Sequence, residues 1–185
     1  VLYVLVTPKV VEAAEASAGS LAVSGGNAGT VSRTEAKPAQ SLYHANTVTL
    51  QVKGKTKDEV IEEMASLLEK DGTLTDKETF KKAIYEREAM STTGMGMGIA
   101  IPHAKTNAVK IPRVAVGISK EGFDFASEDG EPAHLVFMIA TNENGGDLHL
   151  KTLAELSGKL MHEEFTDSLM NAKSREEIVR LLENK

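Results

Sequence analysis

The chain has 185 residues, a formal net charge of −6, no cysteine and only 4% aromatic residues. This length suits one well-filled domain with a tail. The lack of cysteine in this chain excludes disulfides, thiolate metal sites and cysteine nucleophiles. The acidic balance and the few aromatic side chains argue against a nucleic-acid partner, which usually meets a basic surface and stacking rings.

Residues 1–40 have the composition of a linker, because an apolar stub at 1–6 is followed by Ala, Ser, Gly, Thr, Glu and Pro with almost nothing large to bury. No apolar run approaches the roughly 20 residues of a membrane span, so we expect no direct membrane insertion. The stub also lacks the flanks of a secretory signal, which favours a cytoplasmic location. Since the chain begins at a valine, we expect a flexible tail cut from a longer protein, followed by a folded domain at 41–185. A strand and short helix within 1–18, packed on that domain, is the alternative.

The first half of this domain shows one strand and two helices. Apolar and polar residues alternate over 48–52, as in a strand with one solvated face. Capping-box patterns at 56–59 and 75–78 then predict two helix starts. The second helix places Phe80, Ala83, Ile84 and Arg87 along one stripe, so Arg87 points the way that the apolar side chains point.

The second half of the domain also shows strands that alternate with helices. Residues 113–118 and the fully apolar run 135–140 predict two strands, the latter inside a sheet covered on both sides. A helix should follow Asp147, with a buried stripe at Leu150, Leu153, Leu156 and Leu160. Residues 163–172 suggest a short helix, and a capping box at 174–177 predicts the start of a final helix. Strands alternating with helices indicate an α/β fold with helices on both faces of the sheet.

Between these halves, residues 94–105 read Gly-Met-Gly-Met-Gly-Ile-Ala-Ile-Pro-His-Ala-Lys. The alternating glycines permit unusual backbone dihedrals, and Pro102 restricts the backbone that delivers His103. Gly-Ile-Ala-Ile-Pro-His resembles the phosphorylated-histidine motif of the fructose and mannitol type IIA domains of the bacterial sugar phosphotransferase system. This resemblance implies that His103 is the phosphate acceptor, whereas on local features alone a loop histidine without a role is the simpler interpretation.

Two further positions match the pattern of this family. Arg87 lies 16 residues before His103, where the family has an arginine that supports the phosphate, although a cation in the last turn of a helix can also simply cap it. His149 lies 46 residues after His103, at the spacing of the second active-site histidine, and follows Asp147 into the first turn of a helix, which favours anions. A histidine with only a structural role is the alternative there.

The resemblance covers residues 41–185 and implies a mixed, roughly five-stranded sheet with helices on both faces. It also implies phosphotransfer from the carrier HPr to His103, then to a cysteine of a IIB domain that serves a IIC membrane component, with no cofactor. Segments 123–125 and 129–134 favour the fructose branch. An apolar rim for docking partners would then comprise Met95, Met97, Ile101 and Ala104.

Other residues carry weaker signals. Ser91 and Thr92, with Thr93, are candidate phosphate contacts, although such a run is more often turn chemistry. Glu86 and Glu88 should face solvent, and His44, His134 and His162 should be structural or exposed. We expect no metal site, because no third ligand at helix spacing joins His103 and His149. A regulatory module of the same fold, switched by histidine phosphorylation, and a metal-dependent hydrolase remain as alternatives.

Overall fold

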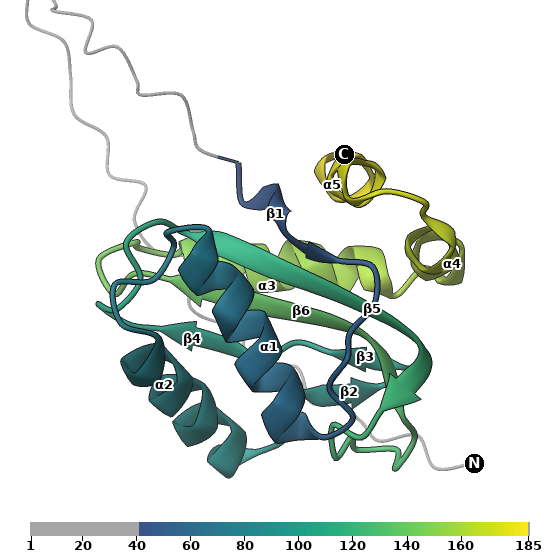
Figure 1. Cartoon of the computed structure of the whole chain (residues 1–185), viewed down its shortest axis with the longest axis horizontal. Helices are drawn as coiled ribbons and strands as arrows, with labels where there is room; N and C mark the ends of the chain where they lie inside the picture. The colour runs from purple at the N-terminus through teal and green to yellow at the C-terminus, as the bar shows by residue number, and fades with distance from the viewer. Residues whose placement is uncertain (1–40, 185) are drawn as a thin grey trace, which may run out of the picture. The chain divides into compact units, whose positions relative to one another are not determined.

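The centre of the fold is a pair of long apolar strands, β5 (Arg113–Phe123) and β6 (Ala133–Thr141), which pair antiparallel (Figure 1). The computed structural model describes residues 41–184. Strand β1 (Tyr43–Thr49) adds to β5 in parallel. On the other side, β3 (Ile99–Ala100) and β4 (His103–Lys105) both pair in parallel with β6, and β2 (Gly94–Gly96) pairs antiparallel with β3. The predicted mixed α/β sheet is therefore confirmed.

The sheet has six strands rather than about five, with the order β1-β5-β6-β3-β2 and β4 also on β6. The additional strand arises because the segment that carries His103 is divided at Ile101 and Pro102. A proline has no N–H to donate to a ladder. The Ile101 N–H turns instead to the carbonyl of Thr93, at 3.0 Å, while the Pro102 carbonyl accepts from Ile139 N–H.

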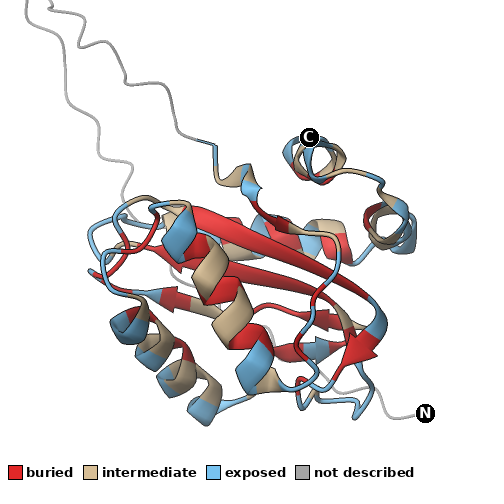
Figure 2. Ribbon diagram, in the orientation of Figure 1, coloured by how far each residue is buried: buried red, intermediate tan, exposed pale blue. Residues whose placement is uncertain are grey.

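Helices cover both faces of the sheet, as predicted (Figure 1). The first face carries α1 (Lys57–Lys70) and α2 (Lys77–Met90). The second carries α3 (Leu148–Leu160), α4 (Glu163–Asn171) and α5 (Arg175–Glu183). The buried side chains accordingly divide into two clusters, and β5 and β6 between them are buried along most of their length (Figure 2).

Alternation along β5 supplies both clusters. Val114, Val116 and Ile118 point to the three-helix face, whereas Ala115 and Gly117 face the side of α1. A Cβ on Gly117 would lie 2.6 Å from Val52 Cγ2 and 3.1 Å from Met64 Cε. Small residues on this side of β5 therefore let α1 pack directly against the sheet.

The predicted helix starts are correct to within one residue. Thr56 forms the full capping box with Glu59 at the start of α1, and Ser174 accepts from the Glu177 N–H at the start of α5. The second start was placed one residue too early, because Asp76 and not Thr75 is the N-cap of α2 and accepts from the Thr79 N–H. The first strand was placed too late, since β1 runs over Tyr43–Thr49 rather than 48–52.

The predictions for residues 1–40, as a flexible linker or as a packed strand and helix, lie outside the described residues. Within 41–184, none of the helices combines the length and the apolar character that crossing a bilayer requires.

Candidate functional site

His103 opens β4 at the edge of the sheet, where its backbone pairs with Ile139 of β6. Its ring is half-buried, and Nδ1 lies 2.7 Å from the carbonyl oxygen of Ile101. A carbonyl can only accept a hydrogen bond, so Nδ1 must carry the proton and Nε2 must carry the free lone pair. The fold thereby fixes both the orientation and the tautomer of this imidazole.

The same surroundings keep the His103 ring neutral. Burial, the largest cause, lowers its pKa below 6.5, and the positive charge of Arg87 lowers it further. The hydrogen bond to Ile101 and the carboxylate of Glu88 act in the opposite direction without reversing the shift. A neutral imidazole with an accessible lone pair is the form that acts as a nucleophile.

His149, the second residue of α3, lies beside His103 across 46 residues of sequence. The two ring centroids are 5.2 Å apart and the rings are tilted by 53°. Its Nδ1 is 2.9 Å from the hydroxyl of Thr141, the last residue of β6. Burial, then the neighbouring His103 and Lys105, lower the pKa of His149, so this ring is also held in its neutral form.

The start of α3 is favourable to an anion. Asp147 stands at the N-cap as predicted, but its side chain makes no capping hydrogen bond, and the first turn contains no acidic residue. The first turn of α3 therefore has backbone N–H groups that no side chain caps, at the positive end of the helix dipole. Lys105 adds a cation nearby, donating to the carbonyl of Gly146 at 3.1 Å.

Arg87 lies in the last turn of α2, the helix that packs against β4. Its Nη1 donates to the Ser91 carbonyl at 3.0 Å, so it does cap the end of the helix. Its positive charge is also among the causes that lower the pKa of His103, after burial. The capping and the site-directed interpretations of Arg87 are therefore compatible, because one guanidinium carries five N–H donors.

Most hydroxyl groups of the loop after α2 are engaged in hydrogen bonds within the protein. The hydroxyl of Thr92 accepts from the Gly94 N–H at 3.1 Å and from Lys57 Nζ at 3.3 Å. Ser91 is exposed and its hydroxyl contacts only the Thr92 carbonyl, at 3.5 Å. Thr93 is buried and donates to Glu88. Of the three residues, Ser91 is the most exposed to solvent.

The burial of some side chains differs from the prediction. Glu88 was expected to face solvent, but its side chain is only 6% exposed, because it pairs with Lys57 and Thr93. Ile101 and Ala104 are also buried and cannot belong to an apolar rim, since they pack into the two cores on either side of the sheet. Leu150, predicted in the buried stripe of α3, is 66% exposed.

The exposed apolar side chains in the described region are instead Met90, Met95, Met97, Leu150 and Met161. Leu150 follows His149 directly, whereas Met95 lies in β2 and Met97 in the turn between β2 and β3, both before His103 in the sequence. Met95 and Met97 were predicted as rim residues, but Leu150 was not. The periodicity of a helix does not tell which turn of its apolar stripe lies outside the core. Leu150 directly follows the candidate residue His149, and this adjacency is a signal in the sequence that could have found it.

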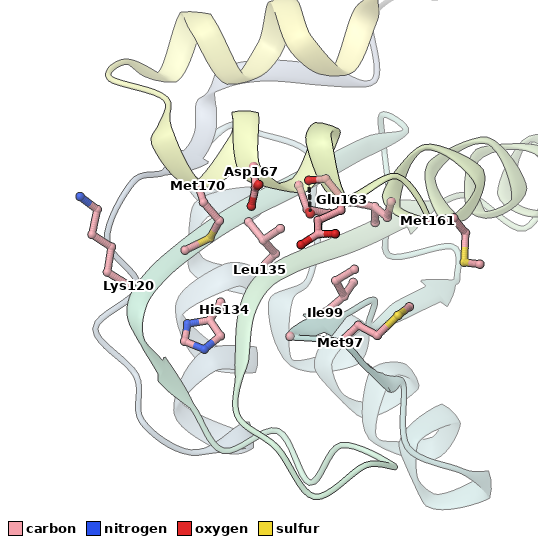
Figure 3. A pocket seen from close by; sticks show the side chains of 12 residues that line it. Met97, Ile99, Lys120, His134, Leu135, Met161, Glu163, Asp167 and Met170 are labelled. Carbon is pink, nitrogen blue, oxygen red and sulfur yellow. Dashed lines mark hydrogen bonds between the residues drawn. The ribbon is translucent and has the colours of Figure 1, made fainter. Parts of the chain in front are cut away.

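A pocket of about 650 Å³ lies elsewhere in the described region (Figure 3). It is lined by Met97, Leu135, Met161 and Met170, with His134 and Lys120 at its side, and by none of His103, Arg87 or His149. His134 Nδ1 is bound to the Ser119 carbonyl at 2.9 Å, and His44 contacts Asp71 at 3.2 Å. Among residues 41–184 no group of three or more His, Cys, Asp or Glu side chains converges as a metal site would.

Taken together, these features define a class of protein: an α/β domain that presents a neutral, oriented imidazole at a sheet edge, beside a second imidazole, a guanidinium and a helix N-terminus. Such an arrangement suits the transfer of an anionic group to nitrogen. Residues 41–185 match the family model described as "Phosphoenolpyruvate-dependent sugar phosphotransferase system, EIIA 2". The chain belongs to this family.

Named relatives agree with this assignment. The chain is 47% identical over 141 residues to the "PTS system fructose-specific EIIABC component" of Bacillus subtilis (strain 168), covering 76% of this chain and 22% of that protein. It is 42% identical over 135 residues to the "PTS system fructose-specific EIIA component" of Haloferax volcanii, covering 73% of this chain and 88% of that protein. The chain thus spans about a fifth of one relative and most of the other.

Solved structures share the fold. The nitrogen regulatory protein IIA-Ntr from Neisseria meningitidis superposes with a TM-score of 0.71 at 30% identity, over 76% of this chain and 96% of that chain. The Escherichia coli enzyme IIA-mannitol was solved in complex with phosphorylated enzyme IIB-mannitol. It superposes with a TM-score of 0.65 at 27% identity, over 75% of this chain and 95% of that chain.

Proposed function

We propose that residues 41–185 are a phosphocarrier domain of a sugar phosphotransferase system, with Nε2 of His103 as the atom that accepts the phosphoryl group. The observation that carries this proposal is the hydrogen bond from Nδ1 of His103 to Ile101, which leaves Nε2 as the free nucleophile beside His149. The donor would be the phosphohistidine of HPr and the acceptor a cysteine of a IIB domain.

The transfer balances without a base or a metal. The lone pair of His103 Nε2 attacks phosphorus, the N–P bond of the donor breaks, and its electron pair returns to the donor ring. No proton has to leave Nε2, because the ring proton resides on Nδ1. The Ile101 carbonyl then stabilises the positive charge that the phosphorylated ring acquires at Nδ1–H.

We assign to Arg87 and His149 the role of binding the phosphoryl oxygens. The guanidinium offers donors beyond the one bound to Ser91, and its fixed charge compensates the charge of the transferring group. If the Thr141 hydroxyl donates to Nδ1 of His149, the proton of that ring lies on Nε2 and is available to a phosphoryl oxygen. Ser91 is a weaker candidate for a further contact, and Thr92 weaker still, because its hydroxyl is already engaged.

The partners are inferred from the same comparisons. The Bacillus relative joins IIA, IIB and IIC components in one protein, and the mannitol relative was solved with its phosphorylated IIB domain. We assign this chain to fructose or a related sugar, on the cytoplasmic side of the membrane and joined or adjacent to a IIC component. Met95, Met97 and Leu150 are the exposed apolar side chains offered to such partners.

The test uses HPr that has first been phosphorylated by the general enzyme and phosphoenolpyruvate and then purified; it is mixed with this chain in chelator-treated buffer, and the labelled residue is mapped. We expect label on His103, none in His103→Ala, and full labelling in His162→Ala, an exposed histidine at the start of α4. A folded His103→Ala variant that still takes up label would defeat the assignment, and a requirement for added metal would favour hydrolase chemistry instead.

A regulatory role is the second candidate, because IIA-Ntr is among the structures that share this fold. Both roles begin with phosphorylation of a histidine, but they differ in the fate of the phosphoryl group. Phosphorylated protein mixed with a fructose-type IIB domain should lose its label to the IIB cysteine if the chain is a transport component. Retention of the label in that mixture would favour a switch that acts through a binding partner.

A further inference from the structure

Glu88 is a buried carboxylate to which the transfer chemistry assigns no role. It follows Arg87 on α2, but successive helix residues diverge by about 100°, so the two side chains point in different directions. Both of its oxygens accept from the Thr93 N–H, at 3.2 Å, and the Thr93 hydroxyl also donates to it. Lys57 of α1 contacts it at 2.8 Å.

A continuous series of hydrogen bonds leads from this carboxylate to the reactive ring. Glu88 holds Thr93, the Thr93 carbonyl accepts from the Ile101 N–H at 3.0 Å, and the Ile101 carbonyl accepts from His103 Nδ1 at 2.7 Å. Each member before the half-buried His103 ring is a backbone group or a buried side chain. The position of the carbonyl that selects the His103 tautomer therefore depends on how α2 holds the loop before β2.

Lys57 makes this arrangement compatible with an incoming phosphate. An unpaired carboxylate so close to His103 would repel a phosphoryl group, and its burial alone would be costly. The ammonium of Lys57 compensates the charge at 2.8 Å, and it also lies 4.9 Å from the centre of the Phe125 ring, which limits its movement. Glu88 can thus serve as an anchor without acting as a repelling charge.

We propose that Glu88, with its charge compensated by Lys57, is a positioning residue that fixes the His103 imidazole through Thr93 and Ile101. This inference rests on the proposed function for its consequence in phosphotransfer, but not for its effect on the ring. Glu88 touches neither the reacting nitrogen nor the phosphoryl group. It acts by keeping the Ile101 carbonyl where the Nδ1–H of His103 can reach it.

The experiment compares Glu88→Ala, Glu88→Gln and the control Glu86→Ala in the 185-residue chain. Glu86 is on the same helix, but its side chain is 68% exposed and its distance to Lys82 is 4.0 Å. Two readouts are used: the nitrogen NMR shifts of the His103 ring, which report the tautomer, and single-turnover transfer from phosphorylated HPr at several concentrations, which separates the rate constant from the affinity.

We expect Glu88→Ala to give a mixture of His103 tautomers and a transfer rate constant lowered by about 10- to 100-fold, with unchanged affinity for HPr, as displacement of a reacting group does. Glu88→Gln should retain the wild-type tautomer and a rate within about 3-fold, because its amide oxygen still accepts from Thr93. Glu86→Ala should match the wild type in both readouts.

A folded Glu88→Ala variant with the wild-type tautomer would overturn the proposal, whatever its stability. Equal slowing in the Gln variant with an unchanged ring would also overturn it, because the charge and not the positioning would then matter. If Glu88→Ala does not fold, Glu88→Leu fills the space but removes both oxygens that accept from Thr93, and an unaltered His103 ring there is equally decisive. Should the wild type not be phosphorylated on His103, the proposed function fails while the NMR comparison still decides the role of Glu88.

Discussion

The Nδ1–H of His103 donates to the carbonyl oxygen of Ile101 at 2.7 Å, across the single residue Pro102. Because proline contributes no N–H and restricts its own φ, this short segment leaves the sheet ladder and returns as β4 with the ring directed by its own backbone. The contact decides which nitrogen is free, and therefore which isomer of phosphohistidine the proposed reaction would form.

Phosphorylation of this chain should yield the Nε2 isomer of phosphohistidine. Nδ1 is occupied as a donor to Ile101, so only Nε2 presents a lone pair. Nitrogen and phosphorus NMR of the phosphorylated protein distinguish the two isomers. Finding the phosphate on Nδ1 would mean that the Ile101 contact breaks before transfer and does not orient the reaction.

Replacing His149 by alanine should slow phosphotransfer by about 10²-fold while the fold is retained, since one positioned hydrogen-bond donor is removed from the developing charge. Rates are measured by rapid quench with phosphorylated HPr, with circular dichroism as the check on folding. His44→Ala is the matched control, because that ring contacts Asp71 and not the site. Unchanged kinetics in His149→Ala would remove this residue from the site.

Arg87→Met should both slow transfer, by about 10²- to 10³-fold, and raise the pKa of His103 towards 6.5. Burial, the larger cause of the lowered pKa, remains in the variant, but the contribution of the guanidinium is lost. Since only the neutral ring attacks, the transfer rate of the variant should begin to fall at a higher pH than that of the wild type. An NMR titration of His103 that shows no rise would place Arg87 too far from the ring to matter.

Stability should fall when the solution is acidified below about pH 6.5, partly because of these two rings. Burial, the largest cause in both, lowers the pKa values of His103 and His149 in the folded state. Unfolded chains therefore bind more protons than folded ones in that range, and the contribution present at pH 7 is lost as pH falls through the folded-state values. Urea unfolding at pH 7.5 and 5.0 should show a smaller loss in the double variant His103→Gln/His149→Gln, and an identical loss would contradict the prediction.

Gly117→Ala should lower the free energy of unfolding by about 1–3 kcal/mol, because the added methyl meets Val52, Val136 and Met64 between β5 and α1. Gly158→Ala provides the control, since Gly158 lies within α3 with nothing near its would-be Cβ, and the change should stabilise by about 0.5–1 kcal/mol. Chemical denaturation measures both. A neutral Gly117→Ala would show that α1 can move away from the sheet at little cost.

Local patterns explain why much of the fold was predictable. Capping residues such as Thr56 and Ser174 bind backbone groups only three residues away. The uninterrupted apolar run of β6 predicts directly that this strand is buried on both faces. Where sequence reasoning was wrong, a distant partner decided the outcome. Glu88 is buried because Lys57 on another helix neutralises it, and Leu150 is exposed although it is in register with Leu153, Leu156 and Leu160.

The sequence by itself determined the family and the elements, because the Gly-Ile-Ala-Ile-Pro-His segment and the periodic apolar residues are properties of contiguous residues. The resemblance named His103, Arg87 and His149 as candidates, but only the tertiary structure decided how they are arranged. The 5.2 Å approach of His149 to His103 requires β4 and β6 to pair in parallel and α3 to start directly after the short loop 142–147 that follows β6. A contact across 46 residues depends on how the chain packs as a whole, and no local pattern of residues encodes it.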